Sequence, residues 1–301
     1  MEDEPKAADD GNAAEGRAAA EEGNVAPLGV EEYVEQAHFF ATLAERIAEN
    51  APTQEVLASI REEVLATTKL PMAIDYLLAE LRHLGVMATA MRKLSHYFTP
   101  LQAYIVAEGE DDLGRFDLRL GLAALAAEAR YRAGLIEGPT GEPTLQGLFF
   151  YQFEVLCRNR LGYDRGLAAI ASDPSYPPRW RDWILATRHQ VGIIDFADLV
   201  YVQSEHARLR GGRGDGPTLF GDREGRIALA NRRKDPLYLF NSLHRQLGYP
   251  APPRPQRSVA QESLVPQMAR RLEQLEKRIK LLEEEQRGGF DLTQFYEKPP
   301  G

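Results

Sequence analysis

The sequence has 301 residues, of which 44% are hydrophobic and 27% are charged, and its formal net charge is −9. This composition supports a packed core in about one to three domains, and the acidic balance argues against wholesale nucleic-acid binding but not against a local basic patch. A single cysteine excludes an intramolecular disulfide and a cysteine-based metal site. The N-terminus lacks the pattern of a secretory signal, and no run of about 18 apolar residues occurs, so we expect a cytoplasmic protein that does not span a membrane.

Residues 1–27 are predicted to form a disordered acidic tail. They contain eight acidic residues, two basic residues and no aromatic residue. Such a segment buries too little apolar surface to offset the entropy of ordering the chain. The tail either screens a basic surface or only keeps the chain soluble.

Residues 28–190 are predicted to form a helical domain. Apolar residues recur at helical spacing from Val30, and proline or glycine interrupts the pattern repeatedly. The glycines at 109–114 predict a break, and the strongly apolar stretch 145–161 predicts a central helix. The predicted helices start near 30, 53, 71, 87, 99, 113, 145, 163 and 179.

One pair of these helices resembles a tetratricopeptide hairpin. The residues that carry the likeness are Phe149, Phe153, Gly162-Tyr163, Leu167 and Asp173-Pro174. The second helix is short for that family and the chain contains no second copy. The resemblance therefore implies a helical hairpin and no activity.

Residues 191–248 are predicted to form a small α+β element packed on the helical domain. The segment 198–204 is rich in β-branched and aromatic residues, and 218–220 and 226–229 flank a loop with glycine at both ends. These features indicate a three-stranded antiparallel meander followed by a helix from Pro236. A helix is the alternative to the first strand, because helical spacing also fits Ile193, Ala197, Val200 and Tyr201.

The densest polar cluster lies where the helical domain meets this element, and it is the leading candidate for catalysis. It consists of His189, Asp195, Asp198, Glu205 and His206, which could supply a general base or bind a divalent metal. The spacings match no catalytic signature, and local backbone capping is the favoured role.

Two Glu-x-x-His pairs, Glu35/His38 and Glu80/His83, have the spacing found in di-iron helix bundles. Helical geometry places them opposite the apolar faces, so we expect no metal site. Cys157 lies among apolar residues, where a thiol is inert. We therefore expect no cofactor and lean away from an enzyme.

The segment from residue 175 to 257 is positively charged, since it contains fourteen basic residues and eight acidic ones. This surface could bind nucleic acid or an acidic partner, dock the acidic tail, or be a solvated face, which is the commonest case. Its candidate binding residues are Arg208, Arg210, Arg213, Arg232, Arg233 and Lys234.

The C-terminal part is predicted to contain a proline-rich spacer (249–263), a coiled coil (264–287) and a flexible aromatic tail (288–301). The seam has the 3,4 spacing of heptad a and d positions and is formed by Val265, Met268, Leu272, Leu275, Ile279 and Leu282. Arg271 and Arg278 each precede a glutamate by five positions, which favours a parallel pair. The alternative is a helix that packs on its own chain.

The aromatic tail contains Phe290, Phe295 and Tyr296, which could dock on a partner or fold back onto the chain. Together these features predict a mainly α-helical, non-enzymatic interaction or scaffold protein that forms a parallel coiled-coil dimer and binds a protein partner. The alternatives are binding of nucleic acid or an acidic partner at 208–234, and an enzyme built on 189–206.

Overall fold

The computed structural model describes residues 27–49, 51–111, 116–136, 142–211 and 217–254, together with Ile279. The chain divides into two units, Met1–Arg254 and Pro255–Gly301. Within the described part of the first unit the fold is helical, which confirms the predicted class, and no helix there is long and apolar enough to cross a membrane. The helices are α2 (Val30–Ala48), α3 (Thr53–Glu63), α4 (Leu70–Leu84), α5 (Ala88–Lys93), α6 (Pro100–Glu110), α7 (Leu118–Arg132), α8 (Leu145–Arg158), α9 (Tyr163–Ala171), α10 (Pro178–Gln190), α11 (Phe196–Val202), α12 (Glu205–Leu209), α13 (Asp222–Ala230) and α14 (Pro236–Leu247).

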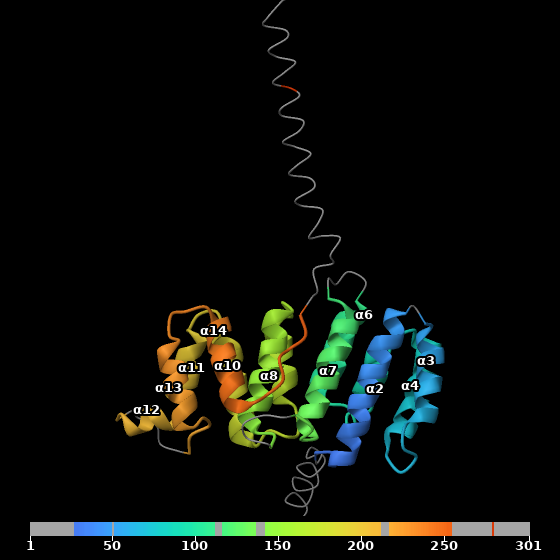
Figure 1. Cartoon of the computed structure of the whole chain (residues 1–301), viewed down its shortest axis with the longest axis horizontal. Coiled ribbons are helices and arrows are strands. Elements are labelled where there is room, and N and C mark those ends of the chain that lie inside the picture. The colour runs from blue at the N-terminus through green and yellow to red at the C-terminus, as the bar shows by residue number, and fades with distance from the viewer. Residues whose placement is uncertain are drawn as a thin grey trace, which may run out of the picture. The chain divides into compact units, whose positions relative to one another are not determined.

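The first six helices pack around α2 and α7, which lie side by side (Figure 1). Thr99 and Gln102 form a reciprocal capping box at the start of α6, where Pro100 occupies the first helical position. The buried Gln102 amide also donates to Gln36 of α2, 3.1 Å away. The predicted break after Gly109 is present, because α6 ends at Glu110 and α7 begins at Leu118.

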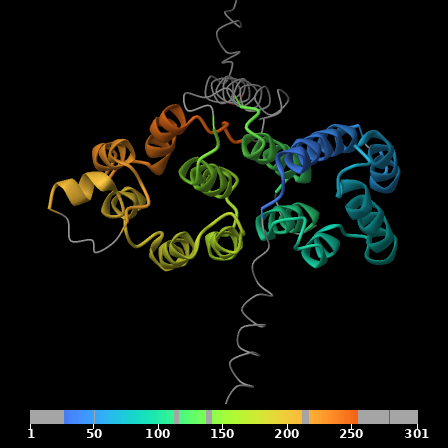
Figure 2. The same ribbon diagram turned by 90° about the horizontal axis from the view of Figure 1, so that it is seen from below.

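The helix α8 is buried on every side, as its apolar sequence predicts. All residues from Gly147 to Leu156 are buried, and Figure 2 shows this helix, in light green, enclosed by its neighbours. Phe149 contacts Trp183 of α10, and Phe153 contacts Phe196 of α11 and Phe240 of α14, with ring centroids 4.6–5.9 Å apart. These aromatic contacts position the later helices around α8.

The helices α8 and α9 form the hairpin that the sequence predicted. Their close approach depends on Gly166, because a Cβ atom there would lie 2.5 Å from Cδ1 of Leu156. The hairpin ends at the buried Asp173, which lies in the connection to α10.

The predicted β-meander is wrong. Residues 198–204 lie mainly in α11, residues 226–229 lie in α13, and the described residues contain only two isolated β-bridges. Burial outweighs the β propensity of these segments, because the helical spacing of Phe196, Ala197 and Val200 places all three in the core. The helical alternative for this segment was therefore the correct one.

Two glycines that suggested a hairpin loop have other roles. Gly221 is the N-cap of α13, and Gly225 lies within that helix. A Cβ atom at Gly225 would lie 2.3 Å from Oγ of Ser204 and 2.6 Å from Cβ of His206. The glycine therefore permits α13 to pack against the start of α12.

A buried polar network connects the first helices with the second half of the unit. The Arg132 guanidinium on α7 donates to Glu128 (2.6 Å), to Ser175 (2.7 Å) and to Asp173, and it lies over the Tyr33 ring of α2. Further bonds link Gln152 of α8 to Glu128 (2.8 Å) and Tyr176 to Gln152 (2.7 Å). Because these groups are buried, each requires the others as hydrogen-bond partners.

Charge within this network sets the protonation of its members. Burial alone would raise the pKa of Asp173, but the positive charge and hydrogen bonds of Arg132 hold it below its ordinary value. Burial would likewise lower the pKa of Arg132, and the charges on Asp173 and Glu128 raise it. The Arg132 cation and the Asp173 carboxylate are therefore ionised at neutral pH.

We expect Arg132→Met to lower the free energy of unfolding at pH 7 by about 3–5 kcal/mol, because two buried carboxylates lose their cation. Urea unfolding measures the effect. The matched control is Arg119→Met, which breaks an ion pair with Asp117 whose side chains are 51% and 46% exposed, and it should cost less than about 1 kcal/mol. Equal losses for the two variants would contradict a central role for Arg132.

The ion pair between Arg132 and Asp173 predicts that the stability of the chain depends on pH. The folded-state pKa of Asp173 is lowered, so its stabilising contribution is present above the unfolded value of about 3.9 and is lost as pH falls through the folded value. Acidification should therefore reduce the stability difference between the Arg132→Met variant and the wild type. A difference that stays constant from pH 7 to the acid transition would argue against an ionised Asp173 at this site.

We expect Gly225→Ala to destabilise the chain by about 1–3 kcal/mol, because the added methyl group overlaps Ser204 and His206. Helix propensity alone predicts the opposite sign, a gain of about 1 kcal/mol. Thermal and urea unfolding measure whether the stability falls, as the overlap predicts, or rises, as helix propensity predicts. Arg223→Ala, an exposed change on the same helix, serves as the control and should stay within about 0.5 kcal/mol.

Candidate functional site

The polar residues predicted from the sequence gather around α11 to α14, but they do not converge on one point. Asp195 is the N-cap of α11: one carboxylate oxygen accepts from the Ala197 amide (3.0 Å) and the other from the Arg233 amide. Asp198, one turn later, forms an ion pair with Arg232. Both carboxylates therefore hold the turn between α13 and α14, which contains part of the predicted basic patch.

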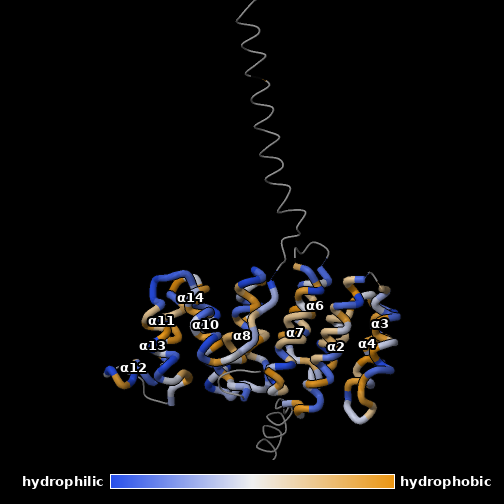
Figure 3. The backbone as a smooth tube through the Cα atoms, viewed as in Figure 1, coloured by the Kyte–Doolittle hydropathy of each residue, from blue (hydrophilic) through white to orange (hydrophobic). Residues whose placement is uncertain are grey.

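This turn is held in an uncommon conformation. Arg233 has a φ of 59°, in the left-handed region that residues with a Cβ atom seldom adopt. The Arg232 guanidinium also lies 5.0 Å from the centroid of the Tyr201 ring. The turn is hydrophilic throughout (Figure 3), and its contacts with α11 hold Lys234 beside the first turn of α14.

A second polar group forms between α12 and α13. The Nδ1 atom of His206 lies 2.8 Å from an Asp222 carboxylate oxygen, and the other oxygen of Asp222 lies 2.8 Å from Arg226. Glu205 pairs with Arg208 at 3.8 Å. The hydrogen bond from His206 is the main cause that lowers the pKa of Asp222.

The catalytic hypothesis required the polar cluster to meet in a cavity. Instead, Asp195 and Asp198 bind the turn after α13, and His206 binds Asp222. No hydrogen bond or ion pair between described residues joins His189 to the other four. The arrangement supplies helix caps and ion pairs, which is the structural role that the sequence favoured.

The two Glu-x-x-His pairs have separate roles. Glu35 was expected to face solvent, and this is wrong: it is buried and accepts from the Leu65 amide at 2.9 Å, because α3 and α4 cover that side of α2. Glu80 pairs with Lys93 at 2.7 Å. Among the described residues no group of three or more His, Cys, Asp or Glu side chains could hold a metal ion.

The lone thiol lies against the core, as expected. Cys157 is partly buried in the last turn of α8. Burial raises its pKa to about 12. A thiol with this pKa is protonated at neutral pH and is a poor nucleophile.

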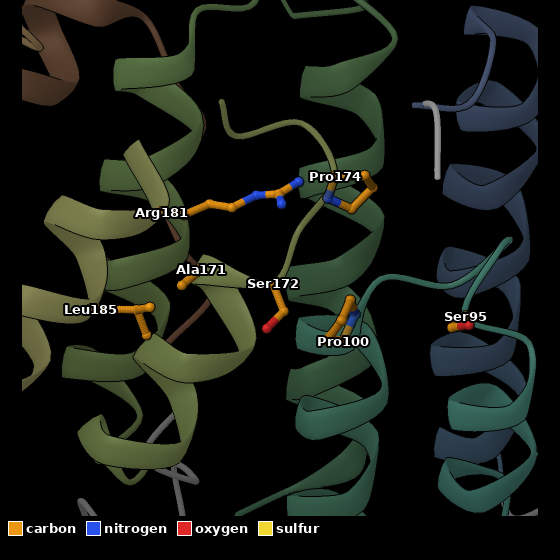
Figure 4. Close-up of a pocket in the computed structure, with 7 residues that line it drawn as sticks. All are labelled: Ser95, Pro100, Ala171, Ser172, Pro174, Arg181 and Leu185. Atoms are coloured by element: carbon orange, nitrogen blue, oxygen red, sulfur yellow. The ribbon is translucent and has the colours of Figure 1, made fainter. Parts of the chain in front are cut away.

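One cavity lies between the α5–α6 connection and the α9–α10 segment (Figure 4). Its Ser172 hydroxyl donates to the Ala168 carbonyl (2.9 Å), and its Arg181 donates to the Tyr176 carbonyl (2.9 Å). Its lining contains no histidine or carboxylate that could act as a base. Its volume is about 380 Å³, and it is lined by Ser95, Pro100, Ala171, Ser172, Pro174, Arg181 and Leu185.

A second cavity lies on the outer face of α14, beside the turn after α13. We call it the α14 groove. Of its residues, only Lys234 was among the sequence candidates. Its volume is about 410 Å³, and it is lined by Asn231, Lys234, Tyr238, Asn241, Ser242 and Arg245.

The remaining candidates lie outside this groove or outside the described residues. Arg208 and Arg210 are exposed at the end of α12. Arg213, Phe290, Phe295 and Tyr296 are not described, nor are the coiled-coil positions other than Ile279, which is helical and 56% exposed. The helical spacing of Tyr238, Asn241 and Arg245, opposite the buried Leu239 and Leu243, was the signal that could have located the groove.

We expect His206→Gln to raise the pKa of Asp222 toward its ordinary value of about 3.9, because the largest cause of its lowering is removed. Carboxyl NMR titration measures this pKa. The carboxyl of Asp164, whose pKa is lowered by Arg188, is the internal control and should not move. An unchanged Asp222 pKa would show that the His206 contact is not formed in solution.

The described arrangement can bind an anionic group more readily than it can move a proton. Two cations line the α14 groove, whereas the carboxylates and His206 are engaged in caps and ion pairs. Comparisons of the chain with protein-family models, with curated proteins and with solved structures each found no match.

Proposed function

We propose that this chain is a non-enzymatic interaction protein that acts as a dimer. The C-terminal segment would associate with a second copy as a parallel coiled coil, and the helical unit would present a binding surface on each copy. The heptad seam between Val265 and Leu282 is the observation that carries this proposal.

Two features of the described residues support the proposal. The a-position residue Ile279 has 56% of its surface exposed in a single chain, so an apolar side chain is available to a partner helix. The polar residues considered for catalysis serve as caps and ion-pair partners, as described above. An interaction role requires no further chemistry from them.

Within a dimer the two helical units would be tethered to each other. Two copies of one binding surface engage a bivalent partner with a higher avidity than a single copy. The basic patch at 208–234 and the aromatic residues of the tail are the surfaces that this proposal offers to partners.

We expect Leu275→Asp, at a d position of the seam, to convert the dimer into a monomer, because two buried carboxylates would face each other across the interface. Sedimentation equilibrium measures the mass of the 33.7 kDa chain. Leu281→Asp is the matched control: the same substitution at a position outside the seam should leave the dimer intact.

A second variant tests the orientation. With Leu282→Cys, near one end of the seam, a parallel pair brings the two new thiols together and forms an intermolecular disulfide under mild oxidation. An antiparallel pair separates them by most of the length of the helix. A wild-type chain that is monomeric at micromolar concentration would contradict the proposal.

A further inference from the structure

The α14 groove combines positive charge with neutral polar groups on one face. Tyr238, Asn241 and Arg245 are exposed along α14, and Lys234 lies at the end of the turn that precedes this helix. The residues on the opposite face of α14, such as Phe240 and Leu243, are buried in the core. The backbone beneath the groove is therefore fixed by the packing of the helix.

Lys234 and Arg245 are the two cations that line the groove. Arg208, Arg226 and Arg232 each form an ion pair with a carboxylate. Within the part of the chain that the structure describes, neither Lys234 nor Arg245 forms one. The nearby Asp235 is the N-cap of α14 and accepts from the Leu237 amide at 2.8 Å.

The neutral groups in the groove have defined orientations. The Asn241 side-chain oxygen accepts from Arg158 at 3.3 Å, which leaves its amide hydrogens as donors. Asn231 and Ser242 donate to the carbonyls of Ile227 and Tyr238, so their oxygens remain as acceptors. Tyr238 is 61% exposed and offers an aromatic surface next to the two cations.

We propose that the α14 groove binds a phosphate monoester on a serine or threonine side chain of a partner protein. The inference rests on the proposed function, since it names the partner chemistry that an interaction protein would recognise. A phosphate monoester carries a charge of about −1.5 to −2, which matches two cations better than the single charge of a carboxylate. Asn231, Ser242 and Tyr238 contact the peptide on either side of the phosphorylated residue.

The charges favour a peptide over nucleic acid. Affinity for nucleic acid depends on several cations that each neutralise a phosphate along a track. The lining of the groove contains two cations. Among the described residues, Arg210, Arg223 and Arg233 form no ion pair, but they are not part of this lining. Arg208, Arg226 and Arg232 are paired with acidic residues. The net charge of −9 also repels a polyanion.

The test uses the full chain and fluorescence anisotropy with a degenerate peptide pool that carries phosphoserine or phosphothreonine at its centre. We expect binding that depends on the phosphate and is displaced by inorganic phosphate. Lys234→Ala and Arg245→Ala should each weaken binding by about tenfold or more, because each removes a charge-assisted hydrogen bond. Both side chains are exposed, so the variants should fold.

The matched control is Arg223→Ala, which removes an exposed charge on α13 outside the groove and should change affinity less than about twofold. Equal binding of the unphosphorylated pool, an equal effect of Arg223→Ala, or preferential binding of a mixed-sequence RNA would overturn the inference. The Leu275→Asp variant separates the two proposals: it should bind a single peptide as the wild type does. A monomeric wild type that still binds the phosphorylated pool would refute the dimer and not the groove.

Discussion

The Arg132 guanidinium, placed between the carboxylates of Glu128 and Asp173, is the contact on which the described unit depends most. It connects α7 to the segment between α9 and α10, and the bonds of Gln152 extend the network into α8. The guanidinium also lies over the Tyr33 ring, so α2 is part of the same network. A buried cation with two carboxylates is stable only when all partners are present, so these four parts of the chain must assemble together.

A second buried pair continues this arrangement toward the groove. Glu154 of α8 accepts from Arg158 (2.5 Å) and from the Tyr249 hydroxyl (3.0 Å), and that hydroxyl also contacts the Phe240 carbonyl of α14. Arg158 in turn donates to Asn241. The core helix α8 thus fixes α14 from beneath, while Asp195 and Asp198 fix the turn that carries Lys234. The surface available for binding is a consequence of these buried contacts.

Much of the fold could be predicted from local pattern, and the errors share a cause. Proline, glycine and apolar spacing located the starts of α2, α6, α8 and α14 because these signals act within a few residues. The prediction of a β-meander was wrong because Val200 and its neighbours are buried by helices distant in sequence. The β propensity of a short segment contains no information about such contacts. Gly225 suggested a loop for a similar reason, since its contact with Ser204 exists only after packing. The groove was missed because its lining unites the turn at Lys234 with one face of α14.

We expect the buried polar contacts to join α2–α7 and α8–α14 into one cooperative unit. Trp180 and Trp183 both lie in α10 and report only on the second group, whereas far-ultraviolet circular dichroism reports on all helices. Urea unfolding of the full chain, followed by both signals on the same samples, tests this cooperativity. We predict coincident transitions with one midpoint and one slope. Two separated transitions would show that the halves unfold independently and that the buried polar contacts do not couple them.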